Sequence, residues 1–462
     1  MTAVPTGAAG TAGTGDATDA GDAGRGPGRP VVPLSRNRDY NVLWTSQLLS
    51  ELALEIAAVA VPLLLIARHG SPVQLGLASS ALAAAHMIAV VPAGVLADRW
   101  DRRRLMLGCQ LLRVLGTASL AGALLLGRYA FWHMLLVVVA DGFLGSVFDP
   151  AEHAALPQVV PPAQLSTAVA RNAARPYVAT LVGPAVAGFL FAALPSGPFL
   201  ANAAMFVLSS VALCFLRLPR GRTGTGARRR PADRQAADRQ AVGPEGAGPE
   251  GADNDGPGAG ADAMAGFRWV LGKPVIRTTM AWMLVTNLVF SALLIVLLAL
   301  SGEDRVGPGE LGLTMACFGV GGLLGGLLAA RLHSAVRPPV ILLGFAWTAV
   351  AATAVMALVP AGLPQGGLLA VLAFLAPLAN TTVLTHQLTV TPDALRGRMS
   401  GVAGFCSGGA GVLGPALGGA LTGIAGGGVA AVLLCAGCLL VVALAATLSP
   451  TLRRFPAPAS ES

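Results

Sequence analysis

Charge is scarce in this chain. Only 12% of its 462 residues are charged, lysine occurs once, at position 273, and the stretches 338–392 and 399–452 contain no Asp, Glu, Lys or Arg. Apolar residues make up 54%, and 59 residues are glycine, a composition that suits closely packed helices in a bilayer. Because a run of about 20 apolar residues can span the hydrocarbon core, the sequence excludes a soluble protein and predicts a polytopic helical membrane protein.

Other absences narrow the function. The phosphate-binding pattern Gly-x-x-x-x-Gly-Lys-Ser/Thr is missing, so energy must come from an ion gradient or from the substrate itself. The six cysteines lie in or beside apolar runs, and no His or Cys spacing matches a metal site. The net charge of +8 reflects arginines beside apolar spans rather than a nucleic-acid surface. We therefore expect no enzyme, no cofactor, no metal and no nucleic-acid partner.

Twelve apolar segments fall into two blocks of six, which predicts an all-α integral membrane protein with two pseudo-symmetric six-helix halves. Between the blocks the composition changes to Arg, Asp, Gly, Pro and Ala, as in a flexible linker. The expected spans are approximately 41–67, 75–97, 105–127, 131–149, 167–193, 198–216, 277–301, 311–332, 338–360, 366–391, 398–423 and 428–449. The expected divisions are a tail at 1–35, a half at 36–217, a linker at 218–265, a half at 266–452 and a tail at 453–462.

An internal repeat supports the duplicated build. Residues 182–190 match 413–421, and residues 94–99 match 326–331 at a nearly equal offset. The second copy has Ala330 where the first has Asp98.

The distribution of arginine predicts the orientation in the membrane. Outside the spans, arginine is concentrated in the tails, the linker and the loops of one parity, and the opposite loops hold only Arg68, Arg128 and Arg305. Basic loops stay in the cytoplasm, so both termini and the linker are expected there, with the chain in the cell membrane.

Short motifs between spans 2 and 3 and within span 5 carry a family resemblance. Gly94, Asp98, Arg99, Arg102 and Arg103 resemble the signature of the major facilitator superfamily, and Gly183-Pro184 resembles its antiporter signature. The segments 70–72, 154–157 and 391–398 resemble the macrolide-efflux and enterobactin-exporter-like branch.

The resemblance implies two halves that rock around a midplane cavity. It also implies that Gly94, Asp98, Arg99, Arg102 and Arg103 form a conformational switch, in which Asp98 and Arg102 make contacts that hold one access state and break in the other. An arginine cluster that only sets the orientation of the chain is the alternative.

Two acids in span 1 are candidates for proton or substrate contact. Glu51 and Glu55 are four residues apart and so share one helix face. Burying an ionised carboxylate in hydrocarbon costs about 2.5–3.5 kcal/mol, so both should face the cavity or be protonated. Burial and mutual repulsion favour the protonated form, which suits a proton carrier or a contact for a cationic substrate. A solvated Glu51 near one membrane surface is the alternative.

Further charges lie inside spans 3, 4 and 5. Arg113 and Asp141 could form a buried pair, serving either structure or coupling. Arg171 and Arg175 are one turn apart on span 5; either both extend to the cytoplasmic surface, or Arg175 lines the cavity and binds an anionic group.

Two Gly-Pro pairs lie inside spans 5 and 11. Gly183-Pro184 and Gly414-Pro415 remove backbone donors and allow close helix approach, which suits helices that bend as access alternates. Close packing without motion would use the same residues.

Together these features predict a secondary transporter, working as a monomer in the lipid bilayer. Few acids and largely apolar spans favour a proton-coupled exporter, or antiporter, of a hydrophobic or amphipathic small molecule such as a drug or secondary metabolite. The alternatives are an importer or facilitator without proton coupling, and a membrane sensor that acts through the linker.

Overall fold

The computed structural model describes residues 33–216 and 272–450, and it contains twelve helices that are long and apolar enough to cross a membrane. The first six are α1 (Arg38–Ala67), α2 (Pro72–Arg99), α3 (Arg102–Leu125), α4 (Phe131–Val159), α5 (Leu165–Ala193) and α6 (Gly197–Cys214). The second six are α9 (Pro274–Glu303), α10 (Pro308–Ala335), α11 (Pro338–Met356), α12 (Leu363–Val390), α13 (Asp393–Ala425) and α14 (Gly428–Leu448). The short 3-10 helices η1 (Leu34–Arg36) and η2 (Pro162–Gln164) complete the secondary structure of the described residues, which include no strand.

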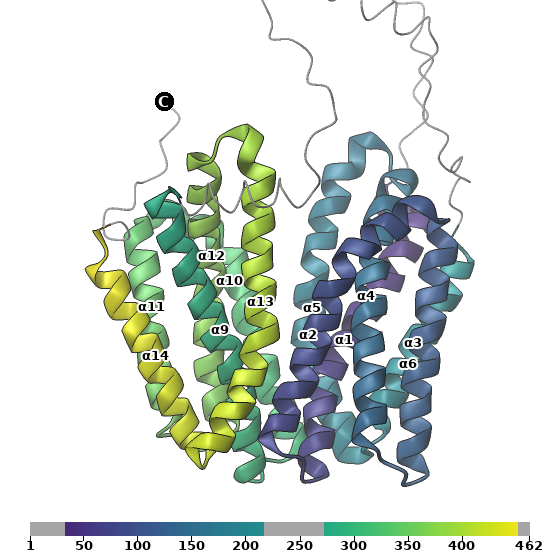
Figure 1. The fold of residues 1–462 in the computed structure, drawn as a ribbon. Coiled ribbons are helices and arrows are strands. Elements are labelled where there is room, and N and C mark those ends of the chain that lie inside the picture. The colour runs from purple at the N-terminus through teal and green to yellow at the C-terminus, as the bar shows by residue number, and fades with distance from the viewer. Residues whose placement is uncertain (1–32, 217–271, 451–462) are drawn as a thin grey trace, which may run out of the picture.

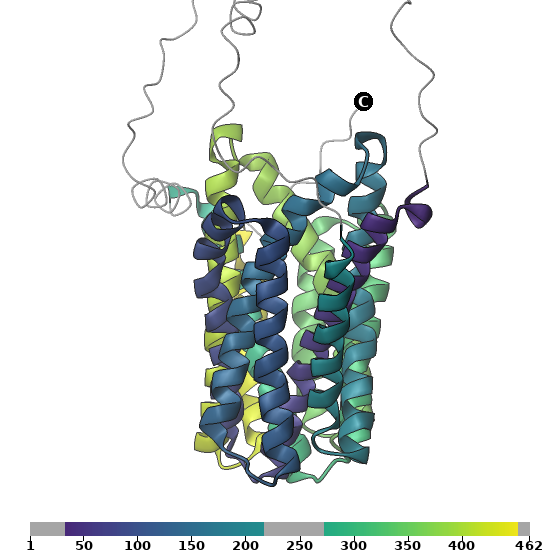
Figure 2. The same cartoon turned by 90° about the vertical axis from the view of Figure 1, so that its right-hand side faces the viewer.

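The predicted fold class, twelve spans in two halves, is confirmed. Helices α1–α6 form one half and α9–α14 form the other. The halves lie side by side in Figure 1, and one lies in front of the other in Figure 2. The two described ranges, 33–216 and 272–450, both begin and end at the same end of the bundle, here called the linker end. The opposite end, here called the far end, carries the short connections such as 126–130 and 304–307. The expected tails and linker lie outside the described residues, apart from residues 33–35 of the first tail.

Local chemistry explains where the helices begin. Ser71 forms a capping box with Gln74 at the start of α2, and the Asp101 side chain accepts a hydrogen bond from the Arg104 backbone at the start of α3. At the far end, the Glu310 carboxylate accepts a hydrogen bond from the Leu363 backbone at the start of α12.

One expected boundary was wrong. The span predicted to end at residue 149 continues as α4 to Val159, with Pro150 and Pro157 inside the helix. Membrane helices tolerate proline because neighbouring groups satisfy the freed carbonyls. This extension places the acidic turn after Asp149 on a helix rather than in a loop.

Glycines allow the two halves to meet toward the far end. At the crossing of α5 and α10, a Cβ atom at Gly188 would lie 2.8 Å from the Cα of Gly312. At the crossing of α2 and α13, a Cβ atom at Gly76 would clash with the carbonyl oxygen of Pro415. Backbone therefore packs directly on backbone, as small residues permit in membrane helices.

We expect Gly188→Val to weaken this contact between the halves. The added side chain has no space beside Gly312, and overpacking of this kind costs about 1–3 kcal/mol. Thermal unfolding in detergent should show a lower midpoint than for Gly122→Val, since a Cβ at Gly122 meets nothing within 4 Å. Equal midpoints for the two variants would contradict the close approach.

Candidate functional site

A cavity lies between the first half and α13. About 570 Å³ of it is open to the centres of water molecules. Its walls come from α1, α2, α3 and α4 on one side and from three glycines of α13 on the other. The polar side chains that line it are those of Gln47, Ser50, Glu51, Glu55, Ser79, His86, Arg113, Asp141 and Asp149, and the glycines are Gly404, Gly408 and Gly411.

The charge of the cavity is one-sided. Among the described lining residues, four carboxylates face a single arginine, Arg113, and all of them belong to the first half. The residues that α13 contributes are all glycine. Low-dielectric walls strengthen the field of such charges. The four acids are Glu51, Glu55, Asp141 and Asp149.

Arg113 and Asp141 form a buried ion pair between α3 and α4. The Arg113 Nε donates to Asp141 Oδ1 over 2.7 Å, and the two side chains are 3% and 12% exposed. The guanidinium also lies 4.1 Å from the centre of the Phe206 ring, a favourable cation–π contact. Sequence left this pairing open; in the structure the two residues are partners at the cavity wall.

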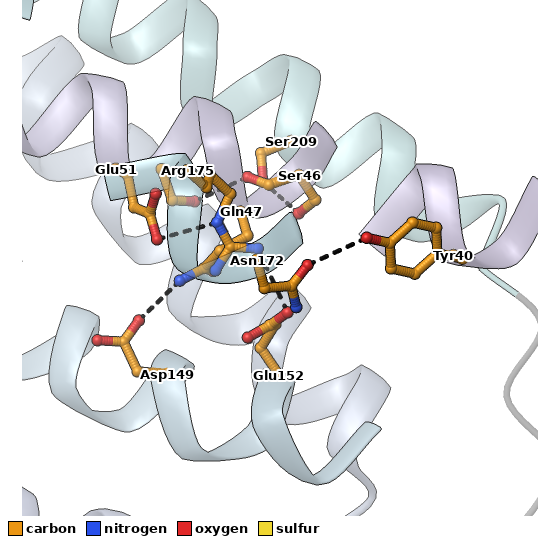
Figure 3. A network of polar contacts seen from close by, with 10 residues as sticks. Tyr40, Ser46, Gln47, Glu51, Asp149, Glu152, Asn172, Arg175 and Ser209 are labelled. Carbon is orange, nitrogen blue, oxygen red and sulfur yellow. Dashed lines mark hydrogen bonds and ion pairs between the residues drawn. The ribbon is translucent and has the colours of Figure 1, made fainter. Parts of the chain in front are cut away.

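Arg175 lies between two carboxylates (Figure 3). Its Nε donates to Glu51 Oε1 over 3.0 Å, and its Nη1 approaches Glu152 Oε1 at 3.5 Å. With 3% exposure, Arg175 does not extend to the membrane surface, so that interpretation was wrong for this residue. Nor is it among the residues lining the cavity; it contacts the cavity acid Glu51 from behind.

The polar network around Arg175 includes residues that sequence reasoning did not single out. Glu152 is fully buried, and the Gln47 amide donates to Asp149 Oδ1 over 3.0 Å (Figure 3). The Tyr40 hydroxyl donates to Asn172 Oδ1 over 3.3 Å. The spacing of Asp149 and Glu152, three residues apart, could have indicated a shared helix face.

The environment of Arg171 differs from that of Arg175, which lies one turn further along α5. Its guanidinium lies 5.9 Å from the ring centre of Tyr40 and 5.3 Å from that of Trp44. Arg171 thus packs over aromatic rings of α1 rather than entering the acidic cavity.

Glu55 has a different environment from Glu51. Thr180 of α5 donates its hydroxyl to Glu55 Oε1 over 2.7 Å, and Glu55 forms no ion pair with a described side chain. The close approach of α5 to α1 depends on Gly183, where a Cβ would lie only 2.5 Å from the Cβ of Glu55. Glu55 is thus a cavity carboxylate whose charge no basic side chain of the described protein compensates.

The Gly-Pro pairs lie in continuous helices. Pro184 is inside α5 and Pro415 inside α13. A Cβ at Gly414 would lie 2.5 Å from the Cβ of Ser291 on α9, which matches the approach of Gly183 to α1 in the first half. Close packing is therefore present at both pairs, and bending remains a prediction.

The predicted switch residues are only partly described. The side chains of Asp98 and Arg99 lie outside the described residues. Arg103 donates to the carbonyl oxygens of Leu213 and Cys214 at the end of α6, a contact within one half. Arg102 is at the start of α3, and a Cβ at Gly94 would meet nothing within 4 Å. The switch itself stays a prediction.

The chain is similar in sequence to a known family of membrane transporters. Residues 43–305 match the Major Facilitator Superfamily, more than half of the chain, and the protein belongs to that family of transporters. The enterobactin exporter EntS of Salmonella typhimurium is 26% identical over 366 residues, which are 79% of this chain and 80% of that protein. The multidrug efflux pump Tap of Mycolicibacterium fortuitum is 29% identical over 389 residues, 80% and 86% of the two chains.

Solved structures show the same fold. The nucleoside transporter NupG superposes with a TM-score of 0.65 at 13% identity, over 88% of this chain and 97% of that one. A bacterial homologue of the human lysosomal transporter Spinster, in an inward-facing and unoccupied conformation, has a TM-score of 0.63 at 15% identity, over 88% and 96%. The chain is thus a membrane transporter and not an enzyme.

We expect the Arg113–Asp141 pair to behave as one unit in stability measurements. Removing one partner leaves the other charge buried, so Arg113→Gln and Asp141→Asn should each cost about 3–5 kcal/mol, whereas the double variant should cost much less than their sum. Thermal unfolding of the three variants in detergent checks this. Additive losses would show that the two side chains do not depend on each other.

Proposed function

We propose that this transporter is a proton-coupled exporter of amphipathic, cationic small molecules, working by alternating access. The observation that carries the proposal is the one-sided cavity, whose described acids all lie on the first half and face a glycine surface of α13. A cationic group can pair with the acids while flat apolar groups lie against the glycines. The names of the relatives, an enterobactin exporter and a multidrug efflux pump, support export of a small molecule.

Glu55 is the residue we assign to the exchange of proton and substrate. Its partner in the described protein is the Thr180 hydroxyl, whereas Glu51 and Asp141 each have an arginine. An unpaired carboxylate inside a membrane is costly, and either a proton or a cationic substrate relieves that cost. Because one carboxylate cannot hold both, binding of one expels the other, which is the requirement for antiport.

The remaining charged groups divide between support and coupling. Arg175 holds Glu51 and lies close to Glu152, so it positions a cavity acid from outside the cavity. The proposed switch consists of Gly94, Asp98, Arg99, Arg102 and Arg103. Its contacts at the linker end would then form in one access state and break in the other.

We propose that the linker end faces the cytoplasm. Both tails and the linker would then be cytoplasmic, as the arginine distribution indicates, and the chain would be a monomer in the cell membrane. The far end, where the halves meet through Gly76 and Gly188, would close the path to the outside in this conformation.

We expect Glu55→Gln to reduce gradient-driven export strongly. The loss of a charge-assisted contact, worth roughly 1.5–3 kcal/mol, corresponds to about a tenfold or greater fall in transport of a cationic dye. Ethidium efflux from cells that lack other pumps, with and without a protonophore, measures this. Glu310→Gln is the matched control. The Glu310 carboxylate accepts a hydrogen bond from the Leu363 backbone and does not line the cavity.

Two results would count against this proposal. If Glu55→Gln exports ethidium as the parent does, Glu55 is not the exchange residue. If the parent exports ethidium equally well after collapse of the proton gradient, the chain is a facilitator without proton coupling.

A further inference from the structure

A groove lies on the outer side of the second half, between the start of α9 and the end of α14. Both of these helix ends are at the linker end, and in Figure 1 α14 lies at the edge of the bundle away from α1–α6. Helix α14 packs against α9, α11 and α13, which all belong to the second half. About 430 Å³ of the groove is open to the centres of water molecules, and it shares no lining residue with the main cavity. The groove is therefore a separate surface, on a side of the second half that faces the bilayer.

The chemistry of the groove changes along its length. Arg277, in the first turn of α9, is the one charged residue among the described lining residues. Trp282 and Val285 lie about 7.5 and 12 Å deeper along α9, at 1.5 Å per residue. The facing wall on α14 is apolar and includes Ala445 and Ala446. The groove thus has a cationic mouth at the linker end and an apolar floor.

No acid on the two helices of the groove opposes the charge at its mouth. Arg277 forms no ion pair with a described residue, and Lys273 lies one turn before it at the start of α9. Residues 272–302 and 428–450 contain no Asp or Glu. The positive end of the α9 dipole lies at the same place. The mouth therefore favours an anionic group.

Trp282 supplies a polar group inside the apolar part of the groove. It is 8% exposed, and its ring packs edge-on against Phe345 of α11, with the ring centres 6.0 Å apart. Its indole N–H donates to no group within the described residues, although a buried indole N–H usually has an acceptor. The Thr278 hydroxyl, by contrast, already donates to the carbonyl oxygen of Pro274 over 2.8 Å. The groove therefore offers a cation at its mouth and an unused N–H donor below it.

In the first half an aromatic ring takes the position that an alanine takes here. Helices α6 and α14 begin at Gly197 and Gly428, so Phe215 and Ala446 are equally far from the two helix starts. The guanidinium of Arg38 on α1 lies over the Phe215 ring, 5.9 Å from its centre. The small side chain at the same position of α14 leaves the space beside α9 open.

We propose that this groove, here called the Arg277 groove, binds one anionic glycerophospholipid. Its phosphate lies at Arg277 and Lys273, an ester carbonyl oxygen accepts from the Trp282 N–H, and an acyl chain runs along Val285 and the alanines of α14. Any phospholipid can place a chain in an apolar groove, so the two cations supply the selectivity for a negative headgroup. Basic pockets between transmembrane helices on the cytoplasmic side bind such headgroups, which agrees with the orientation proposed above. The inference depends neither on the cargo nor on proton coupling.

Thermal unfolding of the purified full-length protein in detergent tests the headgroup selectivity. Phosphatidylglycerol should raise the midpoint by several degrees more than phosphatidylcholine with the same chains, because a ligand of the folded state stabilises it. Arg277→Gln should lose most of this difference, since one cation fewer near the phosphate weakens binding about fivefold. Arg337→Gln is the matched control, because Arg337 is exposed at the start of α11 in the same half and lies outside the groove. Equal midpoints with the two lipids, or an equal loss in both variants, would overturn the proposal.

Native mass spectrometry of the protein titrated with phosphatidylglycerol tests the apolar part. The parent should retain one lipid more than Ala445→Phe, in which the new ring occupies the groove, and Ala430→Phe should bind as the parent does. Both alanines are exposed on α14, but Ala430 lies toward the far end and outside the groove. Three results would overturn the proposal. Inorganic phosphate might protect as well as the lipid does, which would indicate an ion site; a dimer lost in Ala445→Phe would indicate a second copy of the chain; and lipid binding gained only on deletion of residues 451–462 would indicate the chain's own tail.

Discussion

The exclusion of water from a bilayer governs the arrangement of charge in this protein. A carboxylate or guanidinium inside the membrane must find an opposite charge, a hydrogen-bond partner or a water-filled space. Arg113 pairs with Asp141, and Arg175 lies between Glu51 and Glu152. Each pair joins two different helices, so the same contacts that satisfy the charges also fix the helices of the first half against one another.

Glu55 departs from this pattern, and its departure is informative. Its carboxylate is hydrogen bonded to Thr180 but not neutralised by a described basic side chain. The glycine at position 183 brings α5 close enough for that hydrogen bond and leaves no room for a larger residue. The packing of two helices therefore positions a charge that packing alone does not satisfy, which is the usual state of a functional residue.

Much of the fold could be predicted from the sequence because its physical signal is strong. Twelve apolar runs of spanning length and a repeated Gly-Pro pair suffice to indicate a duplicated helical bundle. Boundaries were less certain, since Pro150 suggests a helix end although α4 continues to Val159.

The contacts between side chains on different helices were harder to predict than the helices themselves. Helix spacing places Glu51 and Glu55 on one face, and both do line the cavity. It does not reveal which charge on another helix lies opposite, so the position of Arg175 between two acids and the burial of Glu152 required the tertiary structure. The smaller pocket beside Asp141 is lined by α1, α2, α3, α4 and α6, and it likewise depends on helices from separate parts of the sequence.

The unequal distribution of cavity charge between the two halves has an electrical consequence. All described charges that line the cavity belong to the first half, and α13 contributes only glycine to it. When the second half moves relative to the first, it carries no described cavity charge through the membrane field. The voltage dependence of a transport cycle would then arise from the net charge of the cargo and of any proton exchanged for it, and not from displacement of the protein's own cavity wall.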